Sequence, residues 1–152
     1  MTVRENILEN LRTSLSVITT ANGYHNDIQN VQRWRQQGNS LVAVPCIVIN
    51  AGPEDKDPVP NPLMTCKLTV YLDVWARQDE TDPQSTDTIL NSLLGDVEKA
   101  VMQDITRGGY AKDTNIKSNT LFETLEGQPY SGVVLELEII YQHKQGDPEV
   151  AG

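Results

Sequence analysis

A strict two-residue alternation between Leu63 and Arg77 is the feature that most constrains the fold of this chain. Successive side chains of a β-strand point to opposite faces of a sheet, so the pattern predicts a long strand with one core face and one face toward water or a partner. The predicted core face carries Met64, Cys66, Leu68, Val70, Leu72, Val74 and Ala76. The opposite face carries Thr65, Lys67, Thr69, Tyr71, Asp73 and Trp75.

A second β-rich run, Leu41–Ile49, is apolar on both faces, which predicts a strand buried on both sides. The segment Gly52–Pro62 contains four prolines and several acidic residues, and it predicts a stiff loop between the two strands. A hairpin centred on Lys56 sets Val48 opposite Met64 and Cys46 opposite Cys66. This register predicts that the two cysteines are cross-strand neighbours with buried thiols, which a reducing compartment keeps reduced.

Two helices are predicted from apolar residues that recur every three or four positions. The first covers Val3–Ile18, with Thr2 as its N-cap and Glu5 as the return partner of a capping box. The second begins at Asp82-Pro83 and is stopped by Gly108-Gly109.

The remaining segments complete an α+β fold. Tyr24–Trp34 predicts an irregular strand or extended arm, Leu121–Leu125 a short strand, and Gly132–His143 a long final strand. Residues 144–152 are expected to form a flexible tail. The chain is therefore predicted to be a single domain, 1–152, with a mostly antiparallel four- to five-stranded sheet and two main helices packed on one face.

Composition limits the function. The 152 residues include 38% hydrophobic residues, enough to bury a core, and no apolar run approaches the length of a membrane span. The formal net charge of -9 opposes the binding of a phosphate backbone. It favours solubility, or an acidic channel through which DNA slides without specific binding.

No motif for catalysis or cofactor binding is found. The glycines match neither the P-loop nor the dinucleotide pattern, and His25 and His143 lie outside any metal-ligand spacing. We therefore expect no enzyme activity, no cofactor and no metal. A small acid–base enzyme that uses Glu136 and Glu138, two residues apart on one strand face, stays open as an alternative.

Surface residues suited to partners are the more unusual feature. Aromatic side chains in polar segments and a proline-stiffened acidic loop are typical of protein interfaces, although the aromatics can equally pack against the domain itself. The candidate interface residues are Tyr24, Trp34, Asp55, Asp57, Pro58, Tyr71, Trp75, Glu136 and Glu138.

The order of several segments resembles the tail terminator proteins of tailed bacteriophages, the lambda-like minor tail protein U family. They are the opening helix with Ile18–Tyr24 and Asn26-Asp27-Ile28, the helix Leu90–Val101, the segment Asp104–Gly109 and the closing strand Gly132–Tyr141.

The resemblance implies a homo-hexameric ring that caps the tail tube, stops its polymerisation and docks the neck and head completion proteins. It implies a virion protein of the tail–neck junction, assembled in the host cytoplasm. DNA would pass through the channel without specific binding, and neighbouring subunits would meet through strand edges and loops. A head–tail connector is the alternative within the same structural class.

Overall fold

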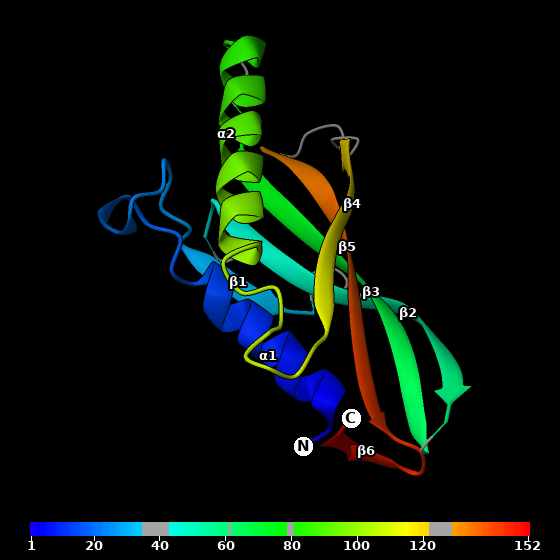
Figure 1. Cartoon of the computed structure of the whole chain (residues 1–152). Coiled ribbons are helices and arrows are strands. Elements are labelled where there is room, and N and C mark those ends of the chain that lie inside the picture. Colours follow the sequence, from blue (N-terminus) through cyan, green and yellow to red (C-terminus); the bar gives the residue numbers. More distant parts are fainter. Residues whose placement is uncertain (35–42, 61, 79–80, 122–128) are drawn as a thin grey trace.

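A curled, mostly antiparallel sheet and two helices make up the structure, a computed structural model that describes residues 1–34, 43–60, 62–78, 81–121 and 129–152 (Figure 1). This is the α+β class that the sequence predicts. The elements are α1 (Val3–Leu15), the 3-10 turn η1 (Thr20–Asn22), β1 (Asn30–Arg33), β2 (Cys46–Val59), β3 (Leu63–Arg77), α2 (Pro83–Val101), β4 (Asp113–Leu121), β5 (Tyr130–Lys144) and β6 (Asp147–Ala151).

Within the described residues the sheet contains six strands, more than the four to five predicted. Its order is β1-β2-β3-β5-β4, and β6 adds to β5 off this path. β1 runs parallel to β2, while every other pair is antiparallel. β6 lies in residues 144–152, for which the sequence favoured a flexible tail. All of its residues are exposed, and its sequence shows no apolar alternation that would mark it as a strand.

The alternation in β3 is confirmed. Six of the seven predicted core positions, from Cys66 to Ala76, are almost completely buried, and Met64 at the strand's beginning is half-buried. β3 lies at the centre of the sheet, between β2 and β5, so both of its edges are hydrogen-bonded, and the side chains of its apolar face lie in the main core cluster. β5 repeats the pattern, with Val133, Leu135, Leu137, Ile139 and Tyr141 buried.

The predicted hairpin register is wrong. β2 continues through the proline-rich segment to Val59, and the chain turns between Val59 and Leu63. Cys46 lies opposite Trp75, and Cys66 lies opposite Lys56. Two features make this possible: a register shift between Ala51 and Glu54 absorbs extra residues, and β2 beyond Ile49 pairs on one side only, where proline is tolerated.

Helix α1 begins as predicted. The Thr2 hydroxyl oxygen accepts a hydrogen bond from the Glu5 amide at 3.1 Å. The apolar stripe is buried, from Val3 to Leu15, and Ile18 is buried just beyond it. The side chain of Glu5 pairs with Arg33 of β1 and so links α1 to β1.

Helix α2 also begins as predicted, at Asp82, but it ends at Val101 and not at the glycine pair. Three consecutive residues then adopt a left-handed backbone, namely Arg107 (φ 49°), Gly108 (φ 70°) and Gly109 (φ 90°). These residues reverse the chain toward β4. Ile105, which falls within the range predicted for this helix, is 42% exposed in the turn.

Strand β4 was not predicted in its observed place. Its sequence, Asp113–Leu121, is polar and shows little apolar alternation, yet it pairs with β5 along its length. The predicted short strand Leu121–Leu125 overlaps β4 at Leu121 alone, and its other residues lie outside the described ranges. Hydrogen bonds to β5 therefore define β4 more than burial does.

Side chains from α1, α2, β2, β3 and β5 form one continuous buried cluster. A smaller cluster of Cys46 and Val48 packs with Val44, Trp75 and Tyr130. In the described ranges, no helix is long and apolar enough to cross a bilayer.

Candidate interaction surfaces

Trp34 is the most exposed aromatic residue of those described, with 71% of its surface accessible. It follows directly after β1, and its amide donates to the carbonyl oxygen of Ile49 at 3.0 Å. Its backbone is left-handed (φ 64°), a conformation that a bulky residue rarely adopts. The fold thus holds this side chain outward at the point where β2 loses its neighbour β1.

A small open pocket of about 90 Å³ lies beside Trp34. Leu8, Ile49 and Ala51 supply apolar lining, and Trp34 and Arg33 complete it. The volume suits one small apolar side chain and not a large cofactor.

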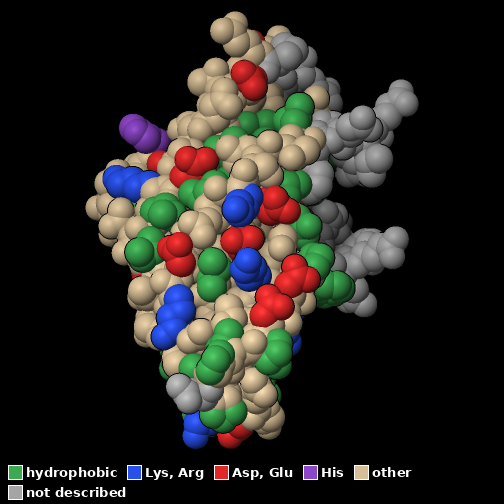
Figure 2. Space-filling model, turned by 45° about the vertical axis from the view of Figure 1, so that its right-hand side comes forward, with side chains coloured by type: hydrophobic (Ala, Val, Ile, Leu, Met, Phe, Trp, Pro, Cys, Tyr) green, Lys and Arg blue, Asp and Glu red, His purple; other side chains and the backbone are tan. Residues whose placement is uncertain are grey.

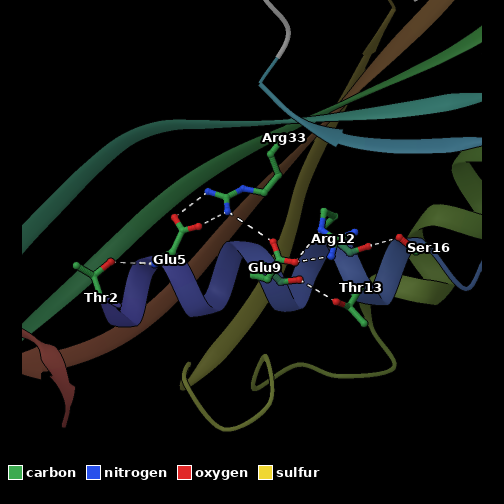
Figure 3. Close-up of polar contacts among 7 residues, drawn as sticks. All are labelled: Thr2, Glu5, Glu9, Arg12, Thr13, Ser16 and Arg33. Atoms are coloured by element: carbon green, nitrogen blue, oxygen red, sulfur yellow. Dashed lines mark hydrogen bonds and ion pairs between the residues drawn. The ribbon is translucent and has the colours of Figure 1, made fainter. Parts of the chain in front are cut away.

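Arg33 is fixed by two carboxylates of α1 (Figure 3). It forms a two-pronged hydrogen bond with Glu5, whose second contact is 3.0 Å long, and an ion pair with Glu9 at 3.7 Å. Arg12 also bonds to Glu9, with Nε at 2.8 Å. The hydrogen bond from Arg33 lowers the pKa of Glu5. The network ties β1 to α1 and keeps the pocket wall in one place.

The arm before β1 is held by Asp96 of α2. This carboxylate is buried and accepts the amides of His25 (3.1 Å) and Asn26 (2.9 Å), as well as the Asn26 side chain (2.9 Å). Tyr24 is half-buried against the core, with the Lys99 ammonium 5.0 Å from its ring centre. Tyr24 therefore serves largely the domain's own packing.

The β2–β3 hairpin carries the predicted loop residues on its strands. Asp55 lies opposite Lys67, Asp57 opposite Thr65 and Pro58 opposite Met64. All three predicted interface residues are exposed. They remain available to a partner, but on a rigid hairpin and not on a loop.

Tyr71 and Trp75 lie on the less buried side of β3. The ring of Tyr71 covers Gly52, where an added Cβ would lie 2.7 Å from the Tyr71 Cε2 atom. Trp75 packs in the small cluster with Cys46 and Val48. Both aromatics are thus half-buried within the chain.

Glu136 and Glu138 lie on the half-exposed side of β5. Ser118 donates to Glu136 at 3.4 Å, and Lys117 lies 3.9 Å from Glu138. Their cross-strand neighbours on β3 are Tyr71 and Thr69. On the face drawn in Figure 2, acidic and basic side chains are interspersed. The two glutamates themselves have polar or charged neighbours on β4, Ser118 and Lys117.

A buried polar cluster lies at the far end of the sheet and was not predicted from the sequence. Tyr141 is 1% exposed, and its hydroxyl donates to Glu54 of β2. Arg4 of α1 bonds to the other oxygen of Glu54, and the Cys66 thiol lies close by. The one usable signal was the position of Tyr141 on the predicted core face of β5, because a buried tyrosine hydroxyl needs a partner.

Burial and hydrogen bonding shift the pKa values in this cluster. Burial acts to raise the pKa of Glu54, but the hydrogen bonds from Tyr141 and Arg4 outweigh it and leave the pKa below its ordinary value. Burial, aided by the hydrogen bond to Glu54, raises the pKa of Tyr141. Burial likewise raises the pKa of the Cys66 thiol, so this cysteine is poorly suited to act as a nucleophile.

His143 extends the cluster and is 5% exposed. Its Nδ1 lies 2.7 Å from the Lys144 carbonyl oxygen, and its Nε2 lies 3.0 Å from the Lys56 ammonium. A carbonyl only accepts and an ammonium only donates. The two distances therefore fit a ring whose Nδ1 donates to the Lys144 carbonyl oxygen and whose Nε2 accepts from Lys56.

Arg107 is a second buried group without a sequence signal. It is completely buried, and its Nη2 donates to the carbonyl oxygens of Val101 and Asp104. Its Nε and Nη1 atoms have no hydrogen-bond partner. Burial lowers the pKa of Arg107. The side chain supplies a positive charge to the negative C-terminal end of α2.

Neither cysteine forms a disulfide, and both are buried. They lie on different sides of the sheet and in different clusters, Cys66 in the main core and Cys46 beside Val48. Their predicted proximity is therefore wrong, because it depended on the wrong hairpin register. Within the described ranges, no group of three or more His, Cys, Asp or Glu residues is arranged to hold a metal ion.

The two sides of the sheet end in strands of different character. On one side, β1 covers β2 only from Cys46 to Ile49, and the rest of β2 carries Pro53 and Pro58. On the other side, β4 contains no proline, and Lys117–Leu121 are all exposed, with Leu121 at 68%. Proline and charge on an edge oppose pairing with another chain. Of the two, β4 is the edge better suited to strand addition.

The chain matches no known protein family and no curated protein.

Proposed function

We propose that this chain is the structural subunit of a phage tail terminator ring, which caps the tail tube, stops its polymerisation and forms the docking face for the head and neck. The proposal starts from the resemblance in segment order. One structural observation supports it most directly: the sheet has two unlike edges, a proline-bearing β2 flanked by the short β1, and an exposed β4. A head-to-tail ring requires two different surfaces on each subunit.

In the proposed assembly, six copies form the ring, and the tail tube protein and the neck or head completion proteins are its partners. We take α1 and α2 to pack on one face of the sheet, so that the other face and the strand edges are left for neighbours. The net charge of -9 suits a lumen through which DNA passes without specific binding. The protein would reside at the tail–neck junction of the virion after assembly in the host cytoplasm.

Electron microscopy of tail tubes polymerised with and without this protein tests the proposal. We expect a ring at one end of each tube and tubes of limited length. Native mass spectrometry of rings released from the tube ends should give one fixed number of subunits per ring. Tubes that grow to the same length with the protein as without it, and that carry no ring, would contradict the proposal.

The same experiment separates the two structural alternatives, since a head–tail connector would bind portal-side proteins and leave the tube ends bare. The enzyme alternative has less support, because Glu136 and Glu138 lie half-exposed and already contact Ser118 and Lys117.

A further inference from the structure

The turn between α2 and β4 buries a charged side chain and exposes an apolar one. Arg107 is completely buried, and its Nη2 donates to two backbone carbonyls, but its Nε and Nη1 make no hydrogen bond within the described residues. Ile105, two positions earlier, is exposed. Burying a charge with unsatisfied donors is unfavourable, and an isoleucine left in water forgoes the gain of burial. Both side chains therefore destabilise the observed turn.

The backbone of the turn is also unfavourable. Arg107 adopts a left-handed conformation (φ 49°), which is disfavoured for a residue with a Cβ atom. Gly108 follows with φ 70°, and a Cβ added to it would lie 3.1 Å from the side-chain nitrogen of Asn10. Backbone strain of this kind persists only where surrounding contacts hold it, and it is common in segments that switch.

Asp104 provides several of the contacts that hold the turn. Its Oδ2 accepts from the Gly108 amide at 2.8 Å and from the Asn10 side chain at 3.2 Å, and its Oδ1 accepts from the Thr106 hydroxyl at 3.3 Å. The Ala111 amide donates to the Thr106 carbonyl oxygen at 2.8 Å. These bonds offset the unfavourable features, so a competing conformation need not be far away in free energy.

A longer α2 would remove the unfavourable features. Val97 and Val101 are buried on the core face of this helix, and Ile105 continues their spacing of four residues. Residues 102–106 contain no glycine or proline that would stop a helix. If the helix continued through them, Ile105 would lie on its core face. Arg107 would lie at its end, where the helix dipole stabilises a cation.

The chain is long enough for this change. Residues 102–106 would lengthen α2 by about 7.5 Å, at a rise of about 1.5 Å per residue. Residues 107–112 would remain as the connection to β4, and they can span roughly 20 Å when extended. The longer helix therefore does not require β4 to separate from β5.

We infer that the α2–β4 turn is a two-state switch, in which α2 extends by about one turn, Ile105 becomes buried and Arg107 leaves the core. The switch replaces an exposed apolar side chain with an exposed cation at this end of α2. A ligand shifts such an equilibrium only through different contacts with the two states, and the two states offer such a difference. The inference goes beyond the proposed ring and does not depend on it.

Gly108→Ala tests the switch, with Gly95→Ala as the control. Alanine is disfavoured in the left-handed backbone of the observed turn, so Gly108→Ala should shift the equilibrium toward the longer helix by roughly 5- to 30-fold. Gly95 lies inside α2 with open space where a Cβ would stand, so its replacement should leave the turn unchanged. Adding Ile105→Ser to Gly108→Ala removes the apolar gain of the longer helix and should reverse the shift.

Two measurements follow the equilibrium. The NMR Cα chemical shifts of residues 102–106 should move toward helical values in Gly108→Ala and return in the double variant. Phenylglyoxal, an arginine reagent, should modify Arg107 faster in Gly108→Ala than in the wild type by the same factor, because the buried guanidinium reacts only from the extended state. Mass spectrometry of the peptides locates the modification, and thermal melts confirm that the variants fold.

Asp104→Ala is a second test variant, needed if Gly108→Ala does not fold. It removes the carboxylate that holds the turn without adding a backbone clash, so both readouts should shift in the same direction. Loss of the fold in both variants would overturn the inference, because it would show that the turn has no folded alternative.

Three other results would also overturn it. They are unchanged Cα shifts and Arg107 modification in a folded test variant, an equal shift in Gly95→Ala, and a shift in the double variant as large as in Gly108→Ala alone. Ring formation on tail tubes is measured separately, so failure of the switch leaves the proposed function standing.

Discussion

Replacing Tyr141 with phenylalanine should reveal how much the buried polar cluster stabilises the fold. The change removes the hydroxyl that donates to Glu54 and keeps the buried ring. The lost hydrogen bond has an ionised acceptor, and bonds of this kind contribute about 1.5–3 kcal/mol. For a domain of this size, that loss corresponds to a fall in Tm of about 3–12 °C.

The effect should depend on pH in a defined direction. Burial acts to raise the pKa of Glu54, but the hydrogen bonds from Tyr141 and Arg4 outweigh it and leave this pKa below its ordinary value of 4.5. Stability from the ionised carboxylate is therefore present above pH 4.5 and lost as the pH falls through the lower, folded-state pKa. The difference between the wild type and Tyr141→Phe should be complete at pH 7 and shrink in acid.

Urea unfolding followed by circular dichroism and tryptophan fluorescence measures the difference, with Tyr110→Phe as the control at an exposed tyrosine. A double-mutant cycle with Glu54→Gln isolates the pair. A loss below about 0.5 kcal/mol at pH 7, the range of ordinary surface substitutions, or additive single effects would refute the reasoning.

Four further outcomes are expected. Burial and its bond to Glu54 raise the pKa of Tyr141, so this residue should stay protonated as the pH rises through 10, and an ultraviolet titration should show the same ionisation there for the wild type and Tyr141→Phe. Arg107→Ala should lower the free energy of unfolding by about 2–4 kcal/mol, because it opens a cavity and removes the partner of the Val101 carbonyl; urea unfolding would show this. Asp96→Ala should speed hydrogen exchange at the two arm amides that bond to it while changing exchange in β3 little, and equal protection in both proteins would contradict this. Cys46 and Cys66 should react with a thiol reagent slowly in native protein and quickly in urea, and prompt labelling of the native form would count against their burial.

Where local chemistry specifies local structure, the sequence predicted the fold well. The alternation of β3, the Thr2 cap of α1 and the Asp82 cap of α2 were all found where the residues indicated. Each of these features depends on neighbours within a few positions. Long-range pairing to a central strand was not required to identify them.

The errors arose where pairing between distant segments decides the structure. The prolines of β2 argued for a loop, yet a strand with one free side accommodates them. Polar β4 is a strand because β5 supplies its hydrogen bonds. Neither fact can be read from the residues of the strand itself, and the wrong loop then set the wrong cysteine register.

The structure divides the candidate interface residues into an exposed group and a half-buried group. Trp34, Asp55, Asp57 and Pro58 are exposed as expected for interface residues, while Tyr24, Tyr71 and Trp75 pack largely within the chain. An aromatic residue in a polar segment looks the same in both cases. Only the three-dimensional environment separates the two groups.

The placement of β3 beside β5 has a consequence for how the chain folds. The pair joins Leu63 with Lys144 and Arg77 with Tyr130, with α2 and β4 between them in sequence. Contacts so distant along the chain slow folding, because a long loop must close before they form. On a translating ribosome, one side of the β2–β3 hairpin would wait for its partner strand until β5 emerges. This interval of synthesis is when the protein is most exposed to misfolding, and a chaperone that binds the hairpin would act during it.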